Sequence, residues 1–111
     1  MIYTTTETVP NYEIIEILEV VSGNVVQSKH LGRDIMAGLK GIVGGELKGY
    51  TEMLTEARSV AIKRLLSKAQ ELRADAVVGI RFTTSSITEG SSEILAFGTA
   101  VKLRRQSDKS G

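Results

Sequence analysis

The chain has 111 residues, of which 41% are hydrophobic and 24% are charged, as expected for one soluble domain with a single core. A net charge of +1 and an aromatic content of 5% argue against a nucleic-acid partner or a membrane partner. The absence of cysteine excludes disulfides, thiolate metal sites and a cysteine nucleophile. The N-terminal residues lack a signal-peptide pattern and no apolar run reaches the ~18 residues of a membrane span, so we expect a cytoplasmic protein.

The N-terminal part of the chain predicts a short strand followed by a long one. Ile2 to Thr6 is rich in β-branched residues and ends before Pro10, the only proline. Glu13 to Gln27 is dominated by isoleucine and valine, which favours a strand with a bend or bulge at Ser22-Gly23-Asn24. Helical spacing is the competing interpretation, and the residues that fit it are Ile14, Ile17, Leu18, Val21 and Val25.

Both faces of this long strand are predicted to be apolar. One face would carry Ile14, Leu18 and Val20, and the other would carry Ile15, Ile17 and Val21. A small antiparallel sheet normally exposes one face to water. We therefore expect this strand to lie either between two layers or in an interface between subunits.

Two helices are predicted in the middle of the chain. Arg33 to Val43 has apolar residues at helical spacing and ends at Gly44-Gly45, a usual helix stop. Glu46 to Arg73 carries the strongest periodic pattern of the chain. Its apolar stripe consists of Leu47, Tyr50, Leu54, Ala57, Ala61, Leu65, Ala69 and Leu72.

The length of the second helix is an argument for self-association. Glu46 to Arg73 would be roughly 42 Å long as an α-helix. A compact globule of this size has a radius of gyration of about 13 Å and hence a diameter near ~34 Å. A helix longer than its own domain protrudes or packs on a neighbour, so we expect a homo-oligomer.

The C-terminal part predicts two strands joined by a turn at Thr88 to Ser91. In the first strand, Ala76 to Ser85, one face would carry Val78, Ile80 and Phe82. The second strand, Glu93 to Leu103, has a face of small residues that lets a helix or backbone approach closely; these are Ala96, Gly98 and Ala100. We expect one domain over residues 1–103 and a disordered polar tail over residues 104–111.

The segment before the long helix contains a candidate metal site. His30 is the only histidine and precedes Asp34 by four residues, and Glu46 follows downstream. Imidazole and carboxylate groups are ligands for divalent metals, so these three side chains form a candidate donor set. A histidine at the surface or at a subunit boundary is the structural alternative, and both interpretations stay open.

A second candidate is an anion site formed by Arg33 with Gly44 and Gly45. Free backbone N–H groups at the start of a helix bind anions, although glycine before a helix is also common for structural reasons. The spacing of these glycines does not match a Walker A phosphate loop. No catalytic residues are predicted, and an enzyme acting on a phosphorylated metabolite is the minority interpretation.

Several stretches resemble those of one family: TTT near the start, KHLGRDIMAGLKGIVGGE, YTEMLTEAR, ADAVVGIRF and AFGTAV. Over Met1 to Leu103 the chain is similar to the YbjQ-like family of uncharacterised proteins, which is labelled "putative heavy-metal-binding". The resemblance implies a dodecin-like α+β subunit that assembles as a homopentamer. It implies no catalytic residues, and the absence of cysteine does not support a heavy-metal site.

Together these observations predict an α+β subunit in which an antiparallel sheet packs against one long and one short helix. We expect a homo-oligomeric ring whose subunits bind a metal ion or a small anion. Two alternatives stay open: a structural or protein-interaction ring without a ligand, and the enzyme named above. A divalent metal is the one cofactor that the residues suggest.

Overall fold

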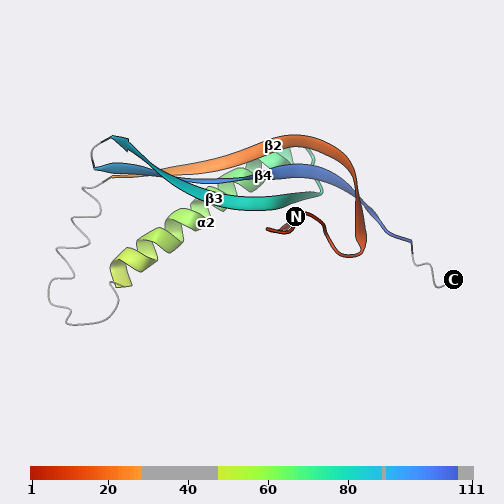
Figure 1. The fold of residues 1–111 in the computed structure, drawn as a ribbon, viewed down its shortest axis with the longest axis horizontal. Helices are drawn as coiled ribbons and strands as arrows, with labels where there is room; N and C mark the ends of the chain where they lie inside the picture. The colour runs from red at the N-terminus through yellow and green to blue at the C-terminus, as the bar shows by residue number, and fades with distance from the viewer. Residues whose placement is uncertain (29–47, 89, 108–111) are drawn as a thin grey trace.

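A computed structural model describes residues 1–28, 48–88 and 90–107 of the chain (Figure 1). These residues form four strands and one helix, in the chain order β1 (Ile2–Tyr3), β2 (Tyr12–Ser28), α2 (Lys48–Glu71), β3 (Ala76–Thr88) and β4 (Ser91–Arg105). The short helix predicted at Arg33 to Val43 lies outside the described residues. No helix in the described part of the chain is long and apolar enough to cross a membrane.

The four strands form one mixed sheet in the order β1-β3-β4-β2. β4 pairs antiparallel with both β3 and β2, whereas β1 pairs parallel with β3, with Ile2 beside Ala76. The predicted α+β class is therefore confirmed, but the sheet is not wholly antiparallel. The difference arises because the N-terminal strand lies beside β3 and runs in the same direction.

β2 confirms the predicted long strand and extends it by one residue at each end. Its pairing with β4 shifts register between Ile14 and Glu16 and again between Ile17 and Glu19, which places a β-bulge at each point. Figure 1 shows that β2 bends strongly toward its N-terminal end, where these bulges lie. β2 is also an edge strand. Ile17 and Val20 are exposed on its face away from α2, so the prediction that β2 could lie between two layers is wrong for the described part of the chain.

The bulge predicted at Ser22-Gly23-Asn24 is wrong, because the pairing with β4 is regular from Glu19 to Ser28. Position 23 requires glycine for a different reason. A Cβ at Gly23 would clash with the carbonyl oxygen of Ala61 and would lie 2.5 Å from the backbone nitrogen of Leu65. Gly23 therefore lets α2 approach the strand backbone directly.

The two bulges change which side chains of β2 share a face. Residues directly opposite each other in an antiparallel pair lie on the same face. On the face away from α2, Ile14, Ile17 and Val20 lie opposite Leu103, Val101 and Thr99. The predicted grouping by strict alternation is therefore wrong, because each bulge inserts one residue and gives these three side chains a spacing of three.

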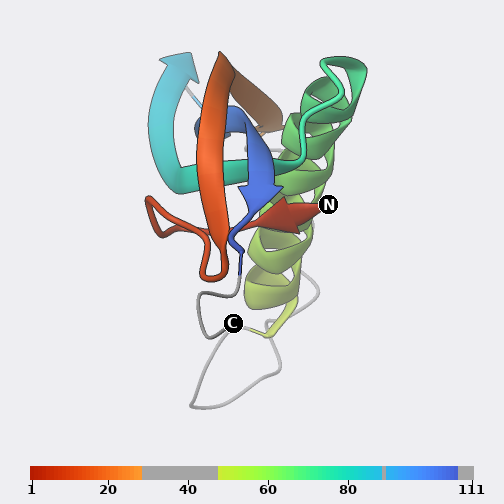
Figure 2. The ribbon, with the colours of Figure 1, turned by 90° about the vertical axis from the view of Figure 1, so that its right-hand side faces the viewer.

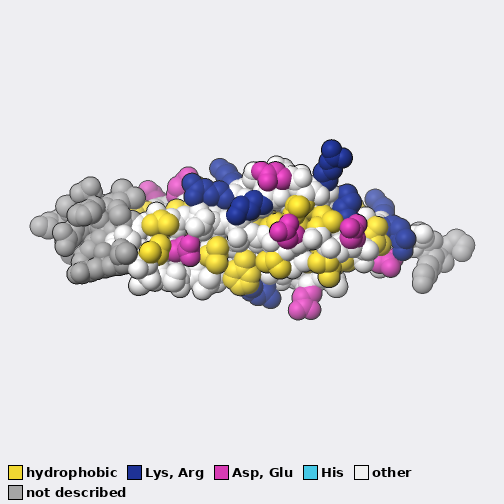
Figure 3. All heavy atoms as spheres, turned by 90° about the horizontal axis from the view of Figure 1, so that it is seen from above, with side chains coloured by type: hydrophobic (Ala, Val, Ile, Leu, Met, Phe, Trp, Pro, Cys, Tyr) yellow, Lys and Arg dark blue, Asp and Glu magenta, His cyan; other side chains and the backbone are white. Residues whose placement is uncertain are grey.

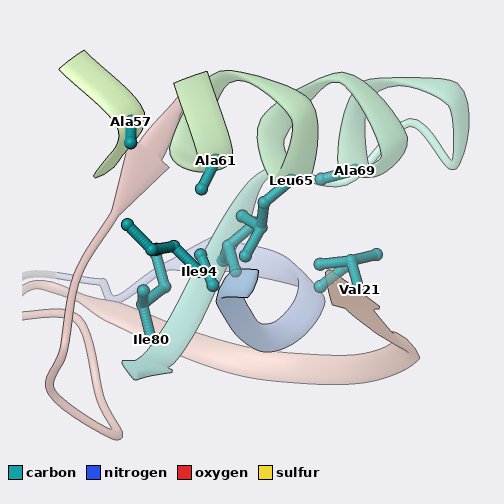
Figure 4. Close-up of a cluster of buried hydrophobic side chains, with 10 residues drawn as sticks. Val21, Ala57, Ala61, Leu65, Ala69, Ile80 and Ile94 are labelled. Carbon is teal, nitrogen blue, oxygen red and sulfur yellow. The ribbon is translucent and has the colours of Figure 1, made fainter. Parts of the chain in front are cut away.

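α2 lies across one face of the sheet, over β2 and β4 (Figures 1 and 2). Its predicted apolar stripe is confirmed from Ala57 to Ala69 by the burial of Ala57, Ala61, Leu65 and Ala69, whereas Leu47 lies outside the described residues. Figure 4 shows these side chains directed toward the sheet; the sheet residues of the same cluster are Val21, Val77, Ile80, Ile94, Ala96 and Ala100. The small face predicted for β4 is thus confirmed, since it lies in the core beneath the helix.

The length of α2 does not require self-association. α2 has 24 residues and is about 36 Å long, whereas the 17 residues of β2 extend for about 56 Å along the strand. The helix is therefore shorter than the strand on which it lies (Figure 1). The prediction of a helix longer than its own domain is wrong because the sheet is elongated and not compact like a sphere.

A second, smaller core lies on the other face of the sheet. Its buried residues are Val9, Ala76, Val78 and Val101, with Tyr12, Ile14 and Leu103 packed against them. Val78 was predicted to share a face with Ile80, but the two belong to different cores. The cause is a register shift between Val78 and Arg81, where Gly79 has a φ of 65°.

The C-terminal hairpin extends further than predicted at both ends. β3 continues to Thr88 and β4 begins at Ser91, which confirms the turn between them. β4 then continues to Arg105, two residues into the predicted polar tail, because Arg104 pairs with Glu13 of β2. Residues 108–111 lie outside the described residues.

Candidate functional site

The structure does not test the ligand residues predicted from the sequence. Those residues are His30, Arg33, Asp34, Gly44, Gly45 and Glu46, and all of them lie outside the described residues. The flanking elements are described: β2 ends at Ser28 and α2 begins at Lys48, at the end of the molecule that also holds the β3–β4 turn (Figure 1). Within residues 1–28, 48–88 and 90–107, no three His, Cys, Asp or Glu side chains gather closely enough to hold a metal ion.

The described residues instead present an uncovered apolar surface on the sheet face away from α2. Ile17 is 71% exposed and Val20 is 69% exposed, and both come from β2. Val26 is 57% exposed, and Phe97 of β4 adds an exposed aromatic ring to the same face. We call these four residues the outer-face cluster. In one view of the molecule, Figure 3 shows hydrophobic side chains in a band along the long axis, between charged groups.

The sheet also has two open edges, one on each side. Among the described residues β2 pairs only with β4, so its other edge presents unpaired backbone N–H and C=O groups. On the opposite side, β1 and the residues after it cover β3 as far as Ile80, whose N–H donates to the Thr4 carbonyl at 3.1 Å. Beyond that point, Arg81 to Thr88 pairs only with β4 in the described part of the chain.

The three threonines near the N-terminus hold this covering segment in place. The N–H of Thr4 donates to the Val77 carbonyl at 3.0 Å, and the N–H of Gly79 donates to the Thr6 carbonyl at 2.9 Å. The Arg81 guanidinium donates to the Thr5 carbonyl at 2.8 Å. The TTT stretch therefore has a structural role, which ends where the open edge of β3 begins.

A groove of about 320 Å³ lies between β2 and the C-terminal half of α2. Its lining residues are Glu19, Val20, Val21, Ser22, Lys68, Glu71 and Leu72. Next to it, the Arg64 guanidinium donates to the Asn24 carbonyl at 2.6 Å, and the Asn24 amide donates to a Glu93 carboxylate oxygen at 2.9 Å. The first hydrogen bond connects α2 to β2, and the second connects β2 to β4.

A family model described as "Putative heavy-metal-binding" matches residues 1–104. The chain belongs to this YbjQ family. It is 73% identical over 105 residues to a UPF0145 protein of Psychromonas ingrahamii, covering 95% of this chain and 100% of that protein. It is 63% identical over 105 residues to a UPF0145 protein of Thermotoga maritima, covering 95% and 99%. The resemblance noted in the sequence is therefore confirmed.

A solved structure is also similar to this YbjQ protein. It is a protein of unknown function from Pediococcus pentosaceus that belongs to the DUF74 family. The TM-score is 0.58 with 17% sequence identity, over 94% of this chain and 98% of that chain. At this identity the similarity shows the fold alone.

The outer-face cluster was not recognised from the sequence as a site. The signal that could have found it was the apolar character of both faces of β2. Strict alternation assigned Ile17 and Val20 to opposite faces, whereas the bulges bring them together. Which side chains share the exposed face of β2 is therefore decided by the positions of the bulges, which the sequence pattern does not show.

Proposed function

We propose that this YbjQ protein is a self-associating subunit, a dodecin-like module that assembles into a homo-oligomeric ring in the cytoplasm. The observation that carries the proposal is the outer-face cluster, in which Ile17 and Val20 are about two-thirds exposed or more. Removing such a side chain from water contributes about 1.5–3 kcal/mol. A contiguous apolar patch on the surface of a soluble protein marks an interaction site.

The arrangement of β2 supports the same proposal. One of its faces packs against α2 through Val21 and Gly23, and the other carries the outer-face cluster. A subunit interface is the interpretation that remains for an edge strand with two apolar faces. Five subunits is the number that the family resemblance suggests.

The oligomeric state tests this proposal directly. Sedimentation equilibrium at micromolar concentration should give a mass several times the 12.0 kDa of one chain. Val20→Lys should shift the protein toward monomer, because it places a charge in the apolar contact. Ser59→Lys adds the same charge on an exposed part of α2 and should leave the mass unchanged. A wild-type protein that sediments at 12.0 kDa would refute the proposal.

The second part of the proposal concerns the ligand. The family description supports a divalent metal ion, and His30, Asp34 and Glu46 are the proposed donors. One imidazole and two carboxylates suit metals of intermediate character, such as zinc, nickel or divalent copper, better than metals that require thiolates. Calorimetric titration with zinc, nickel and copper tests it: no heat above that of His30→Ala would refute the metal site.

An anion is the competing ligand, held by Arg33 and the backbone N–H groups after Gly44 and Gly45. The feature that favours it is a pair of glycines in the sequence shortly before the long helix. Inorganic phosphate is the probe for this site. Binding of phosphate by the wild type, with loss of that binding in Arg33→Ala and no response to metals, would favour the anion over the metal.

A further inference from the structure

We infer that the open edge of β2 pairs with the open edge of β3 from a second copy of this chain. The segments involved are Glu19 to Ser28 on one copy and Arg81 to Ser86 on the other. This inference rests on the proposed self-association and adds to the outer-face cluster a second contact, between the backbone edges of two strands. Both edges lie in the described part of the chain, on opposite sides of one sheet.

Both segments are regular strands without a bulge, although the Asn24 carbonyl in the β2 segment already accepts a hydrogen bond from the Arg64 guanidinium at 2.6 Å. Proteins protect open edges with bulges, prolines and charged side chains. The two bulges of β2 precede Glu19, and the pairing with β4 is regular from there to Ser28. The pairing of β3 with β4 is likewise regular from Arg81 to Ser86. Neither segment contains proline, and each contains a single charged residue.

The charges of the two segments are complementary. The one charged residue of the β2 segment is Glu19, and that of the β3 segment is Arg81. β2 and β3 run in the same direction, because each is antiparallel to β4. A parallel pairing therefore brings the acidic end of one segment to the basic end of the other, and no like charges meet.

The position of α2 makes the two edges complementary in shape as well. Phe82 lies opposite Ala96, on the face that carries the helix, yet it is 43% exposed because α2 lies over β2 and β4. At the other edge, the helix row that contains Val60 and Arg64 lies over β2, since Arg64 reaches the Asn24 carbonyl. A second copy paired with β2 would place its Phe82 beneath this row. The β3 edge of one copy thus has an uncovered aromatic ring, and the β2 edge of the other copy has the helix α2 that would cover this ring.

Pairing between two different edges determines the kind of assembly. Each copy would use β2 toward one neighbour and β3 toward the other, which is a head-to-tail contact. Such contacts close into a ring or continue as a filament, whereas a β2–β2 contact would stop at a dimer. Pairing of β2 with β3 therefore predicts a ring or filament, whereas pairing of β2 with β2 would leave the same residues exposed but give a dimer.

Cysteine cross-linking tests the inference, because the chain has no cysteine of its own. Val20, Ser22 and Thr83 all lie on the face away from α2. In the proposed pairing, Val20 or Ser22 of one copy would lie opposite Thr83 of the next, and a cysteine at each position tests both registers. β4 lies between β2 and β3, which is too far for a disulfide within one chain. Any disulfide in V20C/T83C or S22C/T83C must join two copies.

Under mild oxidation, at least one of the double variants should give a ladder of linked chains on non-reducing denaturing gels. The single variants V20C, S22C and T83C should remain unlinked. S22C/S59C, with its second cysteine on the exposed side of α2, is the matched control and should also give no ladder. Each reduced variant is first shown to sediment like the wild type.

Two outcomes would overturn the inference without affecting the proposed function. One is an oligomer in which neither double variant gives a ladder. The other is efficient dimer formation by V20C or S22C alone, which would mean that two β2 edges meet. A monomeric wild-type protein would instead refute the self-association on which the inference rests.

Discussion

The backbone of Gly23 in β2 lies directly against the carbonyl oxygen of Ala61 in α2, with no room for a side chain between them. Gly23→Ala should therefore force the helix and strand apart. We expect the free energy of unfolding to fall by about 1–3 kcal/mol, the usual cost of overpacking a core. The midpoint of urea unfolding measures this change. Ser22→Ala, at the next position of the strand, should change stability by less than about 0.5 kcal/mol.

Glycine is required at position 79 because of its backbone conformation, and not because a larger side chain would clash with its neighbours. Its φ is 65°, and a Cβ built there has no heavy atom within 4 Å. Gly79→Ala should lower the free energy of unfolding by about 1–2 kcal/mol, because the left-handed region is unfavourable for alanine. Gly79→Asn should lower it less, since asparagine tolerates this region better. Equal losses in the two variants would show that strain is not the cause.

Leu65 is fully buried at the centre of the main core, between α2 and the sheet (Figure 4). Leu65→Glu would place an unpaired charge among apolar side chains, which should prevent stable folding or assembly. Circular dichroism and sedimentation would detect the loss. Ser67→Glu introduces the same side chain at an exposed position of α2 and should leave both signals close to the wild type.

The proposed metal site predicts a specific dependence on pH. Imidazole must be neutral to bind a metal, so the affinity for the cation should fall as the pH decreases through about 6. His30→Ala should abolish binding and leave the oligomeric state unchanged. Calorimetry across this pH range measures the first effect and sedimentation the second. Binding that does not change with pH would exclude His30 as a ligand.

Gly44→Val should separate the two roles that the glycine pair could have. A bulky β-branched side chain at Gly44 would interfere with close packing, and we expect assembly to be lost. Sedimentation would show this result directly. Loss of phosphate binding with assembly intact would contradict it and favour a site at the start of the helix.

The sequence was most informative where one element could be interpreted by itself. The apolar stripe of α2 and the small face of β4 were both predicted correctly, since each follows from the spacing of side chains along one element. Residue type also identified β2 as a strand, although Ile14, Ile17 and Leu18 fit the spacing of a helix. The bulges explain that ambiguity: inserted residues give Ile14 and Ile17 a spacing of three on one face of a strand.

Predictions from the sequence were wrong where the conformation of a residue depends on contacts or bulges that its own local pattern does not reveal. Gly23 was interpreted as a local bend, but the reason for glycine there is Ala61, on an element that follows much later in the chain. Val78 and Ile80 were placed on one face because nothing in their spacing reveals the bulge at Gly79. The predicted ligand residues between His30 and Glu46 stay predictions, since they lie outside the described residues.

The N-terminal residues protect part of a strand that would otherwise be open. The backbone groups of Val77, Gly79 and Ile80 are occupied by residues 4–6, so β3 presents only its distal half to a neighbour. Deleting residues 1–6 would expose the whole outer edge of β3 and remove the boundary that limits pairing to Arg81 and beyond. Long unprotected edges promote uncontrolled strand addition. A chain without residues 1–6 should therefore aggregate more readily than the full chain, because residues 4–6 cover part of this edge.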